Sequence, residues 1–195
     1  ERVDCGYRGE APGFLPLHEP VPYSQHDPQW AQLPLGTSTY TLTTAGCAVT
    51  AAAMLASRID PAITPGTLTS WLNTHNGFTS GGLLHWSKLT ELVTPLEFID
   101  YHVWRSTPAD INKLRSLLDL GPQIVQVDYH PGGPLNTHFV LATAMITGDG
   151  THPEDIAILD PYTGKSTTLL TSYARTGWNL ARAVYAVAEY RSAQP

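Results

Sequence analysis

Four side chains, far apart in the sequence, could together perform nucleophilic chemistry. Cys47 opens a predicted helix directly after Gly46, where the unsatisfied amide groups and the positive end of the helix dipole favour a thiolate. His138 begins an otherwise apolar predicted strand, and Asp160 ends the strand that follows, so pairing of the two strands would let the carboxylate orient the imidazole. Gln25 supplies a neutral amide that could stabilise an oxyanion together with the backbone amide of Cys47. The set predicts acyl transfer through a thioester, with Cys47 as nucleophile and His138 as base.

Each of these residues also has an ordinary structural interpretation. A lone Cys at a helix start is often a small, buried apolar residue. A His in a core strand can simply be satisfied by hydrogen bonds, and Asp160 before Pro161 is typical of a turn. Gln25 taken alone is a polar loop residue. The order of the four in the chain, rather than any one of them, supports the chemical interpretation.

The elements that must position these residues are predicted mostly as helices first and strands afterwards. Apolar spacing and capping residues predict helices at Cys47 to Arg58, Thr64 to Asn76, Ser80 to Leu92, and from an N-cap at Thr107 to Gly121. Alternation and β-branched residues predict strands at 96–104, 123–129, 137–146, 156–160, 165–170 and 182–190. This segregation predicts an α+β fold, in which a helical layer carrying Cys47 packs on an antiparallel sheet carrying His138 and Asp160.

Length and composition predict a single domain. The 195 residues are 42% hydrophobic, which suffices for one substantial core. Residues 1–22 are rich in Pro and Gly and are predicted to form an irregular N-terminal arm, with the domain covering residues 23–195.

Charge and hydropathy exclude several partners. A formal net charge of −6 lacks the basic excess that nucleic-acid binding needs. No apolar run reaches the roughly 20 residues of a membrane-spanning helix, so we expect no membrane insertion. The chain begins at Glu1 rather than Met, which agrees with removal of a leader or upstream segment. The location stays open, with a secreted or cell-envelope protein favoured.

The cysteines and histidines point to a thiol rather than to a metal or a cofactor. Cys5 and Cys47 are too few for a disulfide scaffold and form no CxxC motif, so Cys47 is either a reactive thiol or the partner of Cys5 in a bond that would silence it. The eight histidines form no HxxxH, HExxH or Cys/His cluster, and no glycine pattern matches a phosphate loop. We therefore expect neither a bound metal nor a cofactor.

Five segments of the chain carry a resemblance to a known family. They are Gln-His-Asp-Pro-Gln-Trp from Gln25, Ala-Gly-Cys-Ala-Val-Thr from Ala45, Gly-Pro-Gln-Ile-Val from Gly121, His-Phe-Val-Leu from His138, and Leu-Asp-Pro-Tyr-Thr-Gly from Leu159. In this order they resemble the papain-like cysteine peptidases. Within that family they are most similar to the leader-cleaving domains of bacteriocin exporters and to related stand-alone bacterial domains.

The resemblance implies a papain-like fold, a hydrolase of the thiol protease class, and a role for each of the four residues. Cys47 would be the nucleophile, His138 the base and then the acid, Asp160 the orienting group and Gln25 the oxyanion donor. The chain departs from the family in the run Ala48 to Thr50, where a Gly-Pro-Thr run is usual. It also departs in the 22 positions between Gln25 and Cys47, which require an inserted loop that folds back.

The same fold and chemistry leave the substrate open. A peptide or a peptidoglycan-derived compound would fit, so a peptidoglycan amidase or an acyltransferase is an alternative to a peptidase. A binding domain that keeps the fold without turnover is a third interpretation. Cleavage preference and oligomeric state are not predicted.

Overall fold

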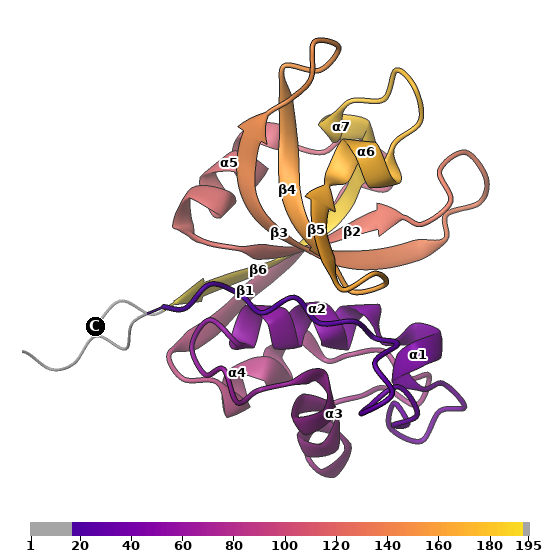
Figure 1. The fold of residues 1–195 in the computed structure, drawn as a ribbon, viewed down its shortest axis with the longest axis vertical. Helices are drawn as coiled ribbons and strands as arrows, with labels where there is room; N and C mark the ends of the chain where they lie inside the picture. The colour runs from indigo at the N-terminus through magenta and orange to yellow at the C-terminus, as the bar shows by residue number, and fades with distance from the viewer. Residues whose placement is uncertain (1–16, 193–195) are drawn as a thin grey trace, which may run out of the picture.

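A six-stranded antiparallel sheet forms the centre of the molecule (Figure 1). The computed structural model describes residues 17–192. The strand order is β1-β6-β2-β3-β4-β5, so β6, the last strand in the chain, pairs between β1 and β2. The strands are β1 (Leu96–Val103), β2 (Gln123–Asp128), β3 (Thr137–Thr147), β4 (Glu154–Asp160), β5 (Lys165–Thr168) and β6 (Val184–Ser192).

Helices cover both faces of this sheet (Figure 1). One side carries α1 (Leu42–Ala45), α2 (Cys47–Ala56), α3 (Pro65–Thr74), the 3-10 turn η1 (Trp86–Lys88) and α4 (Leu89–Leu92). The other carries α5 (Ile111–Leu120), α6 (Leu169–Tyr173) and α7 (Leu180–Ala183). The fold is therefore α+β, as the sequence predicts, although α5, α6 and α7 are interleaved with strands.

Successive side chains of the central strands point alternately into two separate hydrophobic cores, one on each face of the sheet. Ile124 of β2 and Leu141 of β3 belong to the core beneath α2. Val125 and Val140, each one position away, belong to the core beneath α5, α6 and α7, as the two-residue period of a strand requires. With both faces covered, every residue of β2 is buried.

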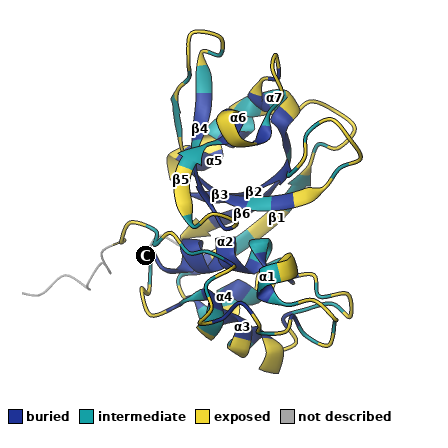
Figure 2. Ribbon diagram, turned by 45° about the vertical axis from the view of Figure 1, so that its right-hand side comes forward, coloured by how far each residue is buried: buried dark blue, intermediate teal, exposed yellow. Residues whose placement is uncertain are grey.

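The helix that begins at Cys47 is the most deeply buried helix on its side of the sheet (Figure 2). Every residue from Val49 to Ala56 is buried, and the run Ala51 to Ala53 has no exposed surface. Small side chains let the helix lie close against the sheet. Cys47 therefore starts a helix that is packed against its neighbours along almost its whole length.

The predicted helix from Ser80 to Leu92 is wrong over its first half. Residues 78–84 form a tight loop closed by a bridge between Phe78 and Leu84, and helical structure starts only at Trp86. The glycines at 81 and 82 explain the difference, because Gly82 adopts a φ of 79° that a helix does not contain.

Several boundaries also differ from their predictions, three of them with a clear local cause. The helix predicted to start after Thr107 starts at Ile111, because the side chain of Asp110 accepts the backbone N–H of Lys113 at 3.0 Å and acts as the N-cap. The strand predicted over 165–170 ends at Thr168, where α6 begins, and the strand predicted over 182–190 begins at Val184, after α7.

The described part of the predicted N-terminal arm contains no helix or strand. Residues 17–22 lie alongside the residues that follow α2. The N–H of His18 donates to the carbonyl of Arg58 at 2.7 Å, and the N–H of Val21 donates to the hydroxyl of Ser57 at 2.9 Å. The rest of the arm, with Cys5, lies outside the described residues. No helix between residues 17 and 192 has the length and apolar character to cross a membrane.

Candidate active site

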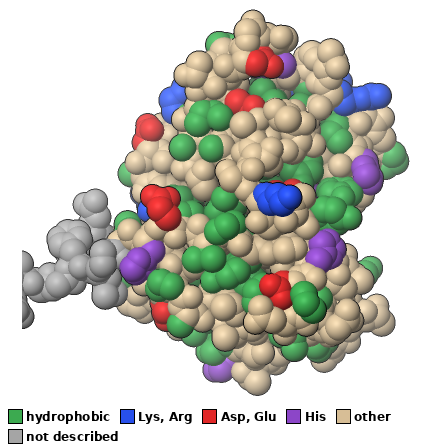
Figure 3. All heavy atoms as spheres, in the orientation of Figure 1, with side chains coloured by type: hydrophobic (Ala, Val, Ile, Leu, Met, Phe, Trp, Pro, Cys, Tyr) green, Lys and Arg blue, Asp and Glu red, His purple; other side chains and the backbone are tan. Residues whose placement is uncertain are grey.

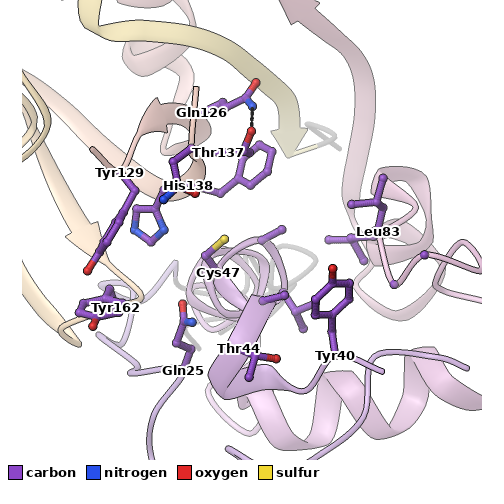
Figure 4. Close-up of a pocket in the computed structure, with 18 of the residues that line it drawn as sticks. Gln25, Tyr40, Thr44, Cys47, Leu83, Gln126, Tyr129, Thr137, His138 and Tyr162 are labelled. Carbon is purple, nitrogen blue, oxygen red and sulfur yellow. Dashed lines mark hydrogen bonds between the residues drawn. The ribbon is translucent and has the colours of Figure 1, made fainter. Parts of the chain in front are cut away.

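Cys47 is the first residue of α2, and Gly46 immediately precedes it as the N-cap. A Cβ atom on Gly46 would overlap the backbone and side chain of Leu42 in α1, so glycine is required there by packing rather than by its φ of −85°. Because Cys47 opens the helix, its backbone N–H has no acceptor within α2. Among the described residues Cys47 is a free thiol, and it lines a cleft between the helical side and the sheet (Figure 4).

His138 and Asp160 are brought together by the pairing of β3 with β4. Nε2 of His138 lies 2.9 Å from Oδ1 of Asp160, and the two residues are only 4% and 3% exposed. Oδ1 also accepts the backbone N–H of Tyr162 at 2.9 Å, and Oδ2 accepts the hydroxyl of Thr163 at 3.3 Å. Asp160 is thus both a turn residue and the hydrogen-bond partner of the imidazole.

The imidazole binds the carboxylate of Asp160 and lines the same cleft as the thiol of Cys47. Burial by itself lowers the pKa of His138, but the hydrogen bonds and charges of Asp160 and Cys47 outweigh it and raise that pKa to about 9. Since Nε2 is engaged by Asp160, the ring nitrogen left for Cys47 is Nδ1. His138 therefore holds its proton at neutral pH.

Asp160 is kept ionised by the same contacts. Burial raises the pKa of its carboxyl, but the hydrogen bond from His138, the backbone N–H of Tyr162 and the hydroxyl of Tyr173 bring the pKa below its ordinary value. Burial and the charge of Asp160 raise the pKa of Tyr173, so its phenol remains a neutral hydrogen-bond donor.

Two tyrosines enclose the His138 ring. The ring centroids of Tyr129 and Tyr173 lie 5.4 and 5.2 Å from that of His138. The ring centroid of Tyr129 also lies 5.0 Å from that of Tyr162. Burial, and then the hydrogen bond with Tyr162, raise the pKa of Tyr129 to about 12. Sequence reasoning missed both residues: Tyr129 follows β2, and Tyr173 ends α6, a helix that no pattern predicted.

Gln25 reaches the same cleft in spite of its distance from Cys47 in the sequence. It is 5% exposed, and its Nε2 donates to the carbonyl of Thr43 at 3.1 Å. The segment between the two residues folds back through a bridge between Pro34 and Thr41, which is the inserted loop that the spacing requires. Among the described residues the second N–H of the Gln25 amide has no acceptor, and its buried Oε1 has no hydrogen-bond partner.

The turn after Asp160 fixes the position of Gln25. The backbone N–H of Gln25 donates to the carbonyl of Pro161 at 2.8 Å. Gly164 closes the turn with a φ of 67°, and a Cβ atom there would meet Ser24 at 2.9 Å. One turn therefore holds both the carboxylate that contacts His138 and the backbone of Gln25.

The cleft around Cys47 has a volume of about 830 Å³. Tyr40 and Leu83 form its rim on the helical side and are exposed, whereas Trp86, Tyr101 and Phe139 form an aromatic wall towards the sheet. The Trp86 ring lies 5.7 Å from that of Tyr101 and 5.2 Å from that of Phe139. Hydrophobic side chains gather along the boundary between the helices α1 to α4 and the sheet (Figure 3).

The structure brings together all four residues singled out in the sequence. Cys47, His138, Asp160 and Gln25 come from α2, β3, β4 and the segment before α1. Within residues 17–192, no group of three or more His, Cys, Asp or Glu side chains could hold a metal ion. The alternative pairing of Cys47 with Cys5 involves a residue outside the described range and stays a prediction.

No protein-family model matches the chain, and neither the curated proteins nor the solved structures compared with it give a match.

Proposed function

We propose that this protein is a thiol hydrolase that cleaves peptide or amide bonds, with the helix-borne Cys and sheet-borne His of a papain-like cysteine peptidase. The observation that carries the proposal is that Cys47 and His138 line one cleft, with the buried carboxylate of Asp160 bound to Nε2 of His138. This is the arrangement by which a base activates a nucleophile while a third group orients the base.

In the first half of the reaction, the Cys47 thiolate attacks the carbonyl carbon of the scissile amide. The negative charge that develops on the carbonyl oxygen is stabilised by the backbone N–H of Cys47 and by the free N–H of the Gln25 amide. His138 then gives its Nδ1 proton to the leaving nitrogen as the C–N bond breaks. The products are a free amine and a thioester on Cys47.

In the second half, water attacks the thioester carbon. His138, now neutral, takes one proton from that water, and the C–S bond breaks to release a carboxylic acid and the thiolate. Asp160 keeps the ring in place through both halves and stabilises the imidazolium each time it forms.

The cleft favours a peptide over a small amide. A volume of about 830 Å³ is near the upper end of the roughly 300–1,000 Å³ typical of small-molecule sites. Its aromatic wall suits bulky side chains. A peptidoglycan-derived peptide would use the same machinery, so peptidoglycan amidase and acyltransferase activity are outcomes that the experiment must separate.

Alkylation tests the nucleophile without knowledge of the substrate. At neutral pH, iodoacetamide should modify Cys47 faster than Cys5, as followed by mass spectrometry of the peptides that contain each residue. The variant His138→Ala should remove this excess, whereas His85→Ala, which changes an exposed histidine at the start of η1, should retain it. A Cys47 no more reactive than Cys5 would overturn the proposal.

Turnover tests the reaction itself. The wild-type protein and Cys47→Ala should be incubated in parallel with a panel of unfolded proteins and with purified cell walls, and the products identified by mass spectrometry. We expect Cys47-dependent cleavage of peptide bonds. Release of cell-wall fragments alone would move the assignment to an amidase, and labelling failure of folded wild-type protein with a vinyl sulfone would favour a binding domain.

A further inference from the structure

The cleft around Cys47 carries one positive charge that no carboxylate of the described residues balances, in contrast to His138, which pairs with Asp160. Arg105 is the only Lys or Arg among the lining residues that the structure describes, and no Asp or Glu lines the cleft with it. Within residues 17–192 no carboxylate lies within 4.0 Å of its guanidinium, in contrast to Arg115 and Arg191, which pair with glutamates. The charge of Arg105 is therefore available to a ligand.

Neutral groups hold the Arg105 side chain at the sheet side of the cleft. Nη2 of Arg105 donates to Oε1 of Gln126 at 3.4 Å, and the hydroxyl of Tyr101 donates to the same oxygen at 3.1 Å. Gln126 is fully buried, and its Nε2 donates to the hydroxyl of Thr137 at 3.0 Å. Arg105 is thus oriented by a fixed amide without being neutralised, and its remaining N–H groups are free for a second acceptor.

This polar group and the proposed oxyanion donor lie on opposite sides of the nucleophile. Figure 4 shows Gln126 and Thr137 on the His138 side of Cys47, with Gln25 across the thiol from them. A substrate whose scissile carbonyl points to Gln25 would therefore extend another part of its chain towards Arg105. The stacked rings of Trp86 and Tyr101 form an apolar surface in this part of the cleft.

We infer that Arg105 determines specificity by binding a carboxylate of the substrate, so that the preferred substrate is an acidic peptide. The inference rests on the proposed function and extends it to a substrate class. A planar guanidinium pairs with a carboxylate through two parallel N–H···O bonds, beside aromatic rings that reduce the access of water. The carboxylate belongs either to an Asp or Glu side chain or to the chain end of the substrate.

Because Arg105 is exposed, solvent screens its charge and the preference is moderate. We expect an acidic substrate to be favoured about twofold to fivefold over its neutral isostere. Replacement of the arginine by a glutamate should reverse the order.

Two measurements test the inference, one of which does not depend on turnover. In the first, a random peptide mixture is equilibrated with immobilised Cys47→Ala protein, and the retained peptides are analysed by mass spectrometry for Asp and Glu against Asn and Gln. Acid and amide forms of each chain end are included to separate the two sources of the carboxylate. The same measurement is made with Arg105→Gln and Arg105→Glu in that background. Arg115→Gln, which removes an arginine of α5, is the matched control.

In the second measurement, wild type, the two Arg105 variants and Arg115→Gln cleave pairs of peptides that differ by a single Glu-to-Gln exchange, and the ratio of kcat/KM within each pair is compared. The expected result is acidic enrichment and a ratio of about two to five in wild type and Arg115→Gln, falling to about one in Arg105→Gln and below one in Arg105→Glu. Retention without acidic enrichment, or a preference that survives Arg105→Gln, overturns the inference. Failure of cleavage with acidic enrichment intact would instead refute the proposed function alone.

Discussion

Replacement of Asp160 by Asn separates the charge of this residue from its shape. Asparagine has nearly the same volume and keeps an oxygen that can accept from both Nε2 of His138 and the backbone N–H of Tyr162, so the turn should remain closed. The variant loses the negative charge. Any change in the titration of His138 then reports the electrostatic part of the contact.

The size of the effect follows from the pKa of His138. Its rise from 6.5 to about 9 corresponds to about 3 kcal/mol in favour of the protonated ring. That gain is net of burial, which acts in the opposite direction, and it is shared between Asp160 and Cys47. An opposite charge in contact typically moves a pKa by about 1–3 pH units, so we expect the pKa of His138 in Asp160→Asn to fall by about that amount.

The same shift makes stability depend on pH. Because the pKa of His138 is higher in the folded protein than in the unfolded chain, its contribution is complete below pH about 6.5 and is lost as the pH rises towards about 9. The free energy of unfolding of wild type should therefore decrease by up to about 3 kcal/mol across this window. In Asp160→Asn the decrease should be smaller and should occur at lower pH.

Two methods measure these changes. NMR of the imidazole carbons gives the pKa of His138 directly, and urea unfolding at pH values from about 6 to 10 gives the stability curve. The control is Asp149→Asn, which removes an exposed carboxylate beside His152 in the loop between β3 and β4. An Asp160→Asn protein that folds normally and still titrates His138 near pH 9 would refute the argument, since the carboxylate would then contribute nothing to the imidazolium.

Three further predictions concern other parts of the site. Gln25→Ala should lower kcat by about 10²–10³ while Cys47 is alkylated at the wild-type rate, and equal losses in both assays would contradict its role as an oxyanion donor. Gly46→Ala should reduce the free energy of unfolding by about 1–3 kcal/mol because the added methyl group overlaps Leu42, as thermal unfolding would show, and an unchanged melting temperature would refute the packing argument. The pKa of Asp160 is lower in the folded protein than its unfolded value of about 3.9, so its ionised form stabilises the fold above that pH, and this stabilisation is lost as the pH falls through the folded pKa. Asp160→Asn should therefore be less sensitive than wild type to acid unfolding, and identical acid midpoints for the two proteins would argue against this reasoning.

The sequence predicts those parts of the fold that local rules determine. The helix that starts at Cys47 and the strands around Ile124 and Leu141 follow from apolar spacing, and the structure confirms them. The short helices α6 and α7 were missed because helices of four or five residues carry too few turns to show a period. Residues 80–84 are predicted as helix but form part of a loop, because the bridge between Phe78 and Leu84 is a contact that no local pattern records.

The candidate site divides in the same way. Residue type and order single out Cys47, His138 and Asp160, since a thiol at a helix start and a titratable ring at a strand start are both visible in a sequence. Tyr173 and Arg105 are invisible there, because the first acts through a hydrogen bond to Asp160 and the second through its place in the cleft. Both become functional candidates only when distant segments meet.

The turn that joins β4 to β5 connects two steps of the proposed chemistry. Its carbonyl at Pro161 holds Gln25, and its first residue, Asp160, holds His138. By thermodynamic reciprocity, any ligand whose binding to Gln25 depends on the protonation state of His138 must change the proton affinity of that ring by the same factor. Occupation of the cleft would then be accompanied by proton uptake or release, and the heat of binding would vary with the ionisation enthalpy of the buffer.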